Sequence, residues 1–218
     1  METKRLLTLI VALCFFGPIQ SQTLYSCNGI YSIKLPASLE LQSSELNSVK
    51  RITTKGKSIQ INISTPSNRI VFQHKGLNAD TKSAYSKYCR IIVEYYKESR
   101  NEPVYGRNDQ IVVNRDVLYL VHNSIEEACN INRTPLIKLL TIQPLNINGF
   151  PVLYYSYRRM GWLKDDGERQ PPVIVNVYQI FNRYESVTLT FSYREAEREN
   201  WKDIHNDIIK TFKFVRFY

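Results

Sequence analysis

The chain has 218 residues, a length typical of one domain. Hydrophobic residues make up 43% of it and charged residues 22%, which excludes a collagen-like, low-complexity or wholly disordered protein. The formal net charge is +9. This charge favours partners with anionic surfaces. The alternative interpretation is that it only keeps the protein soluble.

The first 21 residues have the parts of a secretory signal peptide. Lys4-Arg5 precedes an apolar run from Leu6 to Phe16, and the small residue Ser21 follows. The run is too short to span a bilayer, which needs about 20 apolar residues; the alternative is a buried N-terminal helix. We expect cleavage after Ser21, export to the periplasm or the exterior, and one mature domain over residues 22–218 without a transmembrane segment.

Alternating apolar and polar residues predict short strands in the first part of the mature chain. These strands cover residues 31–36, 49–53, 58–63 and 70–73. Asp80 is a candidate N-cap, and apolar residues recur after it at helical spacing. The pattern therefore predicts a helix over residues 81–99.

The middle of the chain has weaker signals. Residues 111–121 are rich in strand-forming types, so we expect a strand there. Ser124 and Glu127 resemble a capping box and predict a second helix, which Pro135 would split or kink. Asn148-Gly149 predicts a turn.

The last third has the clearest strands. We expect strands over residues 151–159, 173–182 and 187–193, with a hairpin through residues 183–185. A final helix is predicted over residues 195–211, with Trp201, Ile204 and Ile208 on its apolar face. This order indicates an α+β domain in which helices flank an antiparallel sheet.

Two short motifs resemble those of PsbP-like domains. The first is Tyr31-Ser32-Ile33-Lys34-Leu35-Pro36, and the second is Asn148-Gly149-Phe150-Pro151 leading into a strand. A long hairpin and a terminal helix ending near Phe212-Lys213-Phe214 fit the same pattern. The resemblance implies an α/β/α sandwich, here in an exported bacterial protein. It also implies a binding or assembly role, because members of this family are mostly binding or assembly factors and share no catalytic motif.

Three cysteines remain after Cys14 leaves with the signal peptide: Cys27, Cys89 and Cys129. A disulfide could join any two of them, and at least one thiol would then be free or intermolecular. Three cysteines are too few for a disulfide scaffold, so a hydrophobic core must stabilise the domain.

Metal, cofactor and catalytic motifs are weak. His74, His122 and His205 are far apart, and on a helix the side chains of Asp203, His205 and Asp207 cannot converge on one ion. We therefore expect no metal and no cofactor. Cys129 with His122, or Cys89 with His205, could form a thiol–imidazole pair, but chance explains such pairs equally well. The acidic segment at residues 165–168 is typical of a solvated hairpin tip.

The strongest candidate surface is the aromatic and basic run at residues 154–162. In a strand, Tyr155, Tyr157 and Arg159 share one face and Arg158 lies on the other; Trp162 follows. Tyrosine, tryptophan and arginine are typical anchors of protein interfaces. The competing interpretation is structural, because tyrosine suits strands and arginine can cover the rim of a core. The candidate binding residues are Tyr155, Tyr157, Arg158, Arg159 and Trp162.

The leading functional expectation is an exported, non-enzymatic binding or assembly module of the bacterial envelope. Its partner would be an envelope or extracellular protein, and nucleic acid is not expected because export removes the protein from it. A glycan- or small-ligand-binding protein that uses the same aromatic residues is the first alternative. An enzyme of unrecognised type is the second.

Overall fold

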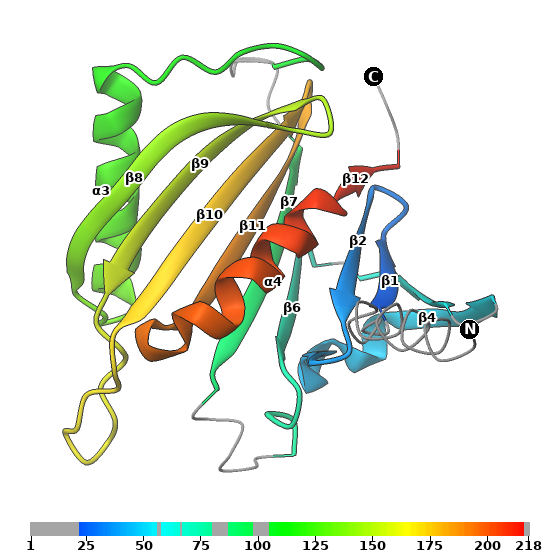
Figure 1. Ribbon diagram of the computed structural model, residues 1–218, viewed down its shortest axis with the longest axis horizontal. Helices are drawn as coiled ribbons and strands as arrows, with labels where there is room; N and C mark the ends of the chain where they lie inside the picture. The colour runs from blue at the N-terminus through cyan, green and yellow to red at the C-terminus, as the bar shows by residue number, and fades with distance from the viewer. Residues whose placement is uncertain (1–21, 56–57, 66, 80–86, 98–104, 216–218) are drawn as a thin grey trace, which may run out of the picture.

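A computed structural model describes residues 22–55, 58–65, 67–79, 87–97 and 105–215 (Figure 1). The predicted signal peptide, residues 1–21, lies outside them. The described chain has an α+β architecture, as the sequence predicted, and contains two sheets and two α-helices. No helix within these residues has the length and apolar character needed to cross a membrane.

The larger sheet has seven strands in the order β3-β6-β7-β11-β10-β9-β8, and every neighbouring pair is antiparallel. Its strands are β3 (Leu39–Leu41), β6 (Arg69–His74), β7 (Cys89–Lys97), β8 (Leu136–Ile147), β9 (Phe150–Arg159), β10 (Val173–Asn182) and β11 (Glu185–Arg194).

A second sheet of five strands, in the order β12-β2-β1-β5-β4, was not foreseen as a separate layer. Strands β1 and β5 are parallel, and the other pairs are antiparallel. The strands are β1 (Gln22–Cys27), β2 (Tyr31–Pro36), β4 (Val49–Lys55), β5 (Ser58–Ile63) and β12 (Lys213–Phe214). The short 3-10 helices η1 (Ser43–Ser48) and η2 (Glu195–Glu197) precede β4 and α4.

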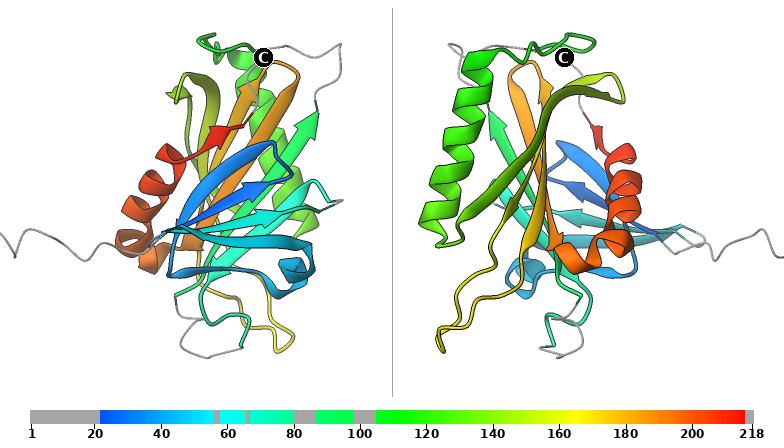
Figure 2. Two further views of the ribbon diagram at one scale, coloured as in Figure 1. Left: turned by 90° about the vertical axis from the view of Figure 1, so that its right-hand side faces the viewer. Right: turned by 60° about the vertical axis from the view of Figure 1, so that its left-hand side comes forward.

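Helices α3 (Arg115–Ile131) and α4 (Arg198–Lys210) lie on opposite sides of the large sheet (Figure 2). Alternation along β9 and β10 explains this: Leu153 and Val175 pack with α3, whereas Val152 and Ile174 belong to the cluster that includes α4. Each of these two strands therefore buries both faces.

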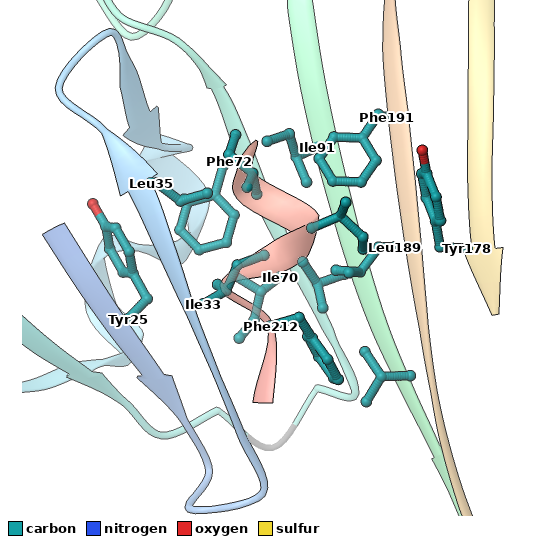
Figure 3. Close-up of a cluster of buried hydrophobic side chains, with 14 of the residues drawn as sticks. Tyr25, Ile33, Leu35, Ile70, Phe72, Ile91, Tyr178, Leu189, Phe191 and Phe212 are labelled. Atoms are coloured by element: carbon teal, nitrogen blue, oxygen red, sulfur yellow. The ribbon is translucent and has the colours of Figure 1, made fainter. Parts of the chain in front are cut away.

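The main core lies between α4, the small sheet and the α4 side of the large sheet. Figure 3 shows side chains of both sheets meeting there, among them Leu35 of β2, Phe72 of β6 and Phe191 of β11. These three side chains are buried almost completely. The small sheet thus adds a second cover to this side of the large sheet.

Both predicted turns are confirmed. The hairpin between β10 and β11 turns at Arg183-Tyr184, with Arg183 at φ 53°. Between β8 and β9, Asn148 and Gly149 have φ values of 55° and 88°, as a two-residue hairpin with two left-handed positions requires. Pro144 is tolerated within β8 because β8 is an edge strand.

The prediction of a helix over residues 81–99 is wrong for the described part of that range. Residues 89–97 form β7, which pairs with β6 on one side and with β11 on the other. Cys89, Ile91 and Val93 are buried at a spacing of two, and the extra apolar residue Ile92 faces the other side of the sheet. The pairing of this segment with β6 and β11 outweighs the helical spacing of its apolar residues. Residues 80–86 lie outside the described chain.

The middle segment was also predicted incorrectly. Residues 115–121 are the first part of α3 and not a strand. Asn114 is the N-cap, since its Oδ1 accepts a hydrogen bond from the Val117 amide at 2.9 Å, so the helix begins well before Ser124. Pro135 follows the helix and does not kink it. The long strand β8 that comes next was missed, as were β1 and β3.

Candidate binding groove

A cavity of about 1010 Å³ opens on the α3 side of the large sheet. It lies between the C-terminal end of α3, the segment after β9, and the strands β6, β7 and β11. Helix α3 packs on β9 and β10, so it leaves this part of the sheet uncovered. The side chains that β7 and β11 present here include Arg90, Thr190 and Ser192. Within the described residues, the groove is thus the part of this sheet face that α3 does not cover.

The groove is positively charged. Two cations come from β6 and β7, two from the C-terminal ends of β9 and β11, and one from the segment after β9. They are Arg69, Arg90, Arg159, Lys164 and Arg194. No aspartate or glutamate is among the described residues that line it. Five cations with no carboxylate among the described lining residues produce a positive potential, which ion pairs at the edge reduce at Arg69 and Lys164.

Three of these cations have partners at the edge of the groove. The Arg69 Nε lies 3.7 Å from the Glu94 carboxylate, and Lys164 pairs with Glu168. Arg194 Nη2 donates a hydrogen bond to Gln170 Oε1 at 2.9 Å. Both ion pairs are partly exposed, so each contributes little to stability.

Arg90 and Arg159 have no carboxylate within 4 Å among the residues that the structure describes. The Arg90 guanidinium lies 5.9 Å from the centre of the Tyr88 ring, and its buried Nε has no hydrogen-bond partner in the described part of the chain. Arg159 Nη1 donates to the backbone oxygen of its neighbour Met160 at 3.0 Å. Both guanidinium groups therefore keep donors for a ligand, and their planar geometry suits a carboxylate.

Aromatic side chains line the groove beside these cations. Trp162 is 60% exposed, whereas Tyr157 is buried between β10 and α3. Burial, with a smaller contribution from Cys129, raises the pKa of Tyr157 to about 12, so its phenol stays protonated at neutral pH. The groove thus combines the exposed indole ring of Trp162 with the neutral phenol of Tyr157.

The segment after β9 forms one wall of the groove. Gly161 is needed there because a Cβ at this position would lie 2.3 Å from the backbone oxygen of Gln170. Arg169 Nη1 donates to the Gly161 carbonyl at 3.1 Å, and the Gln170 amide donates to the Trp162 carbonyl at 2.9 Å. Residues 165–168 form the exposed tip of this segment, as predicted.

The structure separates the five residues that the sequence singled out. Tyr157, Arg159 and Trp162 line the groove. Tyr155 packs against the cluster beneath α3 and is not among the lining residues. Arg158 is on the other face of β9, where Nη2 lies 2.6 Å from the Glu195 carboxylate. Alternation along β9 makes one common surface impossible.

Sequence reasoning missed Arg90 and Arg194, which β7 and β11 bring into the groove. The polar stripe of β11, which includes Thr190 and Ser192, was recognisable and marks an uncovered sheet face. Arg90 gave no such signal, because its segment was expected to be helical.

The three cysteines are free and buried, so the disulfide considered among them is not present. Cys27 lies in the small sheet, Cys89 in the large sheet facing α4, and Cys129 on α3. The second and third are on opposite faces of the same sheet, which explains why they cannot meet.

Cys89 and His205 are in contact, with 3.3 Å between Sγ and Nε2. Burial raises the pKa of the Cys89 thiol well above its ordinary value and lowers the pKa of the His205 imidazole to about 3. Both groups are therefore neutral at neutral pH. A nucleophilic cysteine needs the opposite conditions, so the geometry does not make this pair a reactive dyad.

The fold defines a class of structure rather than an activity: the chain has a PsbP-like fold. The solution structure of cyanobacterial PsbP from Synechocystis sp. PCC 6803 is similar to it at a TM-score of 0.53 and 15% identity, covering 92% of this chain and 95% of that one. The yeast Ran-binding protein Mog1p, from Saccharomyces cerevisiae, is similar at a TM-score of 0.45 and 13% identity, covering 86% and 91%. A Pseudomonas aeruginosa protein of unknown function, PA94, is similar at 0.42 and 10%, covering 74% and 94%. No family model matches the sequence, and no curated protein matches it.

Proposed function

We propose that this protein is a non-enzymatic binding module whose groove takes up an acidic segment of a partner protein. We also propose that it is exported, with residues 1–21 as its signal peptide, and that the partner is in the bacterial envelope. The observation that supports the binding role is the set of five groove cations, with no carboxylate among the described lining residues.

The chemistry of the groove favours a protein segment. Arg90 and Arg159 present planar guanidinium groups that can each bind a carboxylate through two hydrogen bonds. Trp162 supplies an exposed aromatic anchor beside them. Arginine and tryptophan are enriched among the residues that contribute most to protein interfaces. A cavity of about 1010 Å³ is also at the upper end of the range of small-molecule pockets, which suits a longer ligand.

A direct test measures binding of the purified protein to a fluorescent peptide rich in glutamate and leucine, with a glutamine version as the neutral control. Arg159→Glu and Arg90→Glu should each weaken binding of the acidic peptide by about 10-fold or more, because each variant puts a like charge in the groove. Binding should also weaken between about 50 and 300 mM salt. Trp162→Ala should weaken binding at both salt concentrations without unfolding the protein.

The matched control is Lys138→Glu, which makes the same change in net charge on β8, outside the lining residues. It should bind the acidic peptide like the wild type. Equal losses in all three charge variants would mean that only net charge matters and would overturn the proposed groove. Binding of dextran sulfate but not of the acidic peptide would reject the protein segment in favour of an acidic glycan.

A further inference from the structure

A second, smaller cavity of about 290 Å³ lies on the other side of the large sheet, between α4 and the strands β8 to β11. It is separate from the groove because the sheet itself lies between them. Its size is at the lower end of small-molecule pockets. Any occupant is therefore a small molecule and not a polymer segment.

The floor of this cavity is polar, whereas the core beside it on the same sheet face is apolar. Asn176 and Ser156 are directly paired across β10 and β9, and Tyr178 and Tyr154 are the next pair on the same face. Tyr154 donates a hydrogen bond from its hydroxyl to Asn176 Oδ1 at 2.9 Å. The Asn176 side-chain oxygen is thus occupied, and its NH₂ group, which also interacts with the Tyr193 hydroxyl, retains one donor for a ligand.

Aromatic rings form the walls. The Tyr154 and Tyr178 rings lie 4.7 Å apart with an angle of 30° between their planes, and Tyr193 lines the cavity as well. These two rings pack against each other, and the ring surface that faces the cavity favours a flat ring as a neighbour. The cavity is therefore suited to a planar, aromatic ligand.

Two cations from α4 line the same cavity. Arg198 and Lys202 are exposed and one helical turn apart. Neither has a carboxylate within 4 Å in the described part of the chain, and none of the described lining residues is acidic. Burial raises the pKa of Tyr154 and of Tyr193, and the positive charge of Arg198 opposes both rises, which places that charge near both phenols.

We infer that this cavity binds a small aromatic carboxylate, with its ring among the three tyrosines and its carboxylate at Arg198 and Lys202. The Asn176 amide, on the cavity floor, would donate to a hydroxyl on the ring. The observation that supports the inference is the presence of two cations, without an ion-pair partner among the described residues, beside three tyrosines and a polar floor. The inference does not depend on the proposed function of the groove.

Isothermal titration with 4-hydroxybenzoate as the probe tests this inference. The wild type should bind it, should bind benzoate more weakly, and should not bind 4-hydroxybenzyl alcohol, which lacks the carboxylate. The double variant Arg198→Gln/Lys202→Gln should weaken binding by about 10-fold or more, because the carboxylate then loses both charged donors. Asn176→Leu should remove most of the preference for 4-hydroxybenzoate over benzoate.

Two controls separate this cavity from the groove. Lys213→Gln removes a charge from the exposed residue Lys213 of β12, outside the lining residues, and should leave binding unchanged. Arg159→Glu disrupts only the groove, so it should also leave 4-hydroxybenzoate binding unchanged. Absence of binding heat in the wild type, equal binding of acetate and 4-hydroxybenzoate, or unchanged binding by the double variant would each overturn the inference.

Discussion

The two faces of the large sheet differ in how they are covered. The α4 face is covered by both α4 and the small sheet, and its core includes the fully buried rings of Phe72, Phe191 and Phe212. The α3 face is covered by one helix, which packs on β9 and β10 and leaves β6, β7 and β11 to line the groove. The α4 face therefore supplies most of the stability, and the α3 face leaves space for a ligand.

Strand β11 shows this difference within ten residues. Its apolar residues Val187, Leu189 and Phe191 all enter the α4-side core. Thr190 and Ser192, which alternate with them, line the groove. A central strand that was buried equally on both faces would be apolar throughout. The alternation of β11 therefore marks the face that stays open.

The largest expected effect is a difference in stability between the two faces. Phe191 contacts Tyr178 and His205, with ring centres 5.6 Å and 4.5 Å away. Phe191→Ala should lower the free energy of unfolding by about 3–5 kcal/mol, because it leaves a cavity that both sheets and α4 enclose. Ile125→Ala on α3 should cost about 2 kcal/mol, at the lower end for such a change, because α3 can shift toward the open side.

Urea denaturation of the two variants and the wild type measures both values. An Ile125→Ala cost equal to or larger than that of Phe191→Ala would contradict the view that the α4 face supplies most of the stability.

The second effect is a dependence of the free energy of unfolding on pH that comes from His205 on the α4 face. Burial lowers the pKa of His205 to about 3, and the ionisable side chains described in contact with it are Cys89 and Tyr193. Below about pH 6.5 the unfolded chain takes up a proton that the folded chain excludes. The free energy of unfolding is therefore highest above pH 6.5 and should fall by about 2 kcal/mol between about pH 7.5 and pH 5 from this residue.

Urea denaturation at both pH values, for the wild type and His205→Gln, isolates this contribution from that of the carboxylates. The variant should lose about 2 kcal/mol less than the wild type over the same pH interval. His122→Gln is the control for removing a histidine at a partly exposed position, on α3. An unchanged pH dependence in His205→Gln would mean that the buried imidazole does not remain neutral.

The sequence predicted the elements whose local pattern agrees with their final environment. Strands β2, β9, β10 and β11 have strong alternation or flanking turns, and α4 has one apolar face that the structure buries. Strand β7 was missed because apolar residues on both of its faces resemble a helical stripe when its neighbours are unknown. Its two partners, β6 and β11, are separated by more than one hundred residues in the chain.

The groove was predictable only in part, for the same reason. Tyr157, Arg159 and Trp162 are close in sequence and were recognised together. Arg90 joins them only through β7, which is linked to β9 through the intervening strands β11 and β10. Which strands become neighbours depends on long-range pairing, and no local spacing records it.

The smallest expected effect concerns how α3 is held on its face. Asn114 caps the first turn through its side chain, whereas Ser124 is an exposed residue in the interior of the helix. Asn114→Ala should therefore lower the free energy of unfolding by about 1 kcal/mol and reduce hydrogen-exchange protection in α3 more than in α4. Ser124→Ala should be neutral or raise stability by a few tenths of a kcal/mol, because alanine is the better helix former. If Ser124→Ala were the more destabilising change, α3 would begin near Ser124, as the capping-box pattern predicted, and the residues before it would not form a helix over β9 and β10.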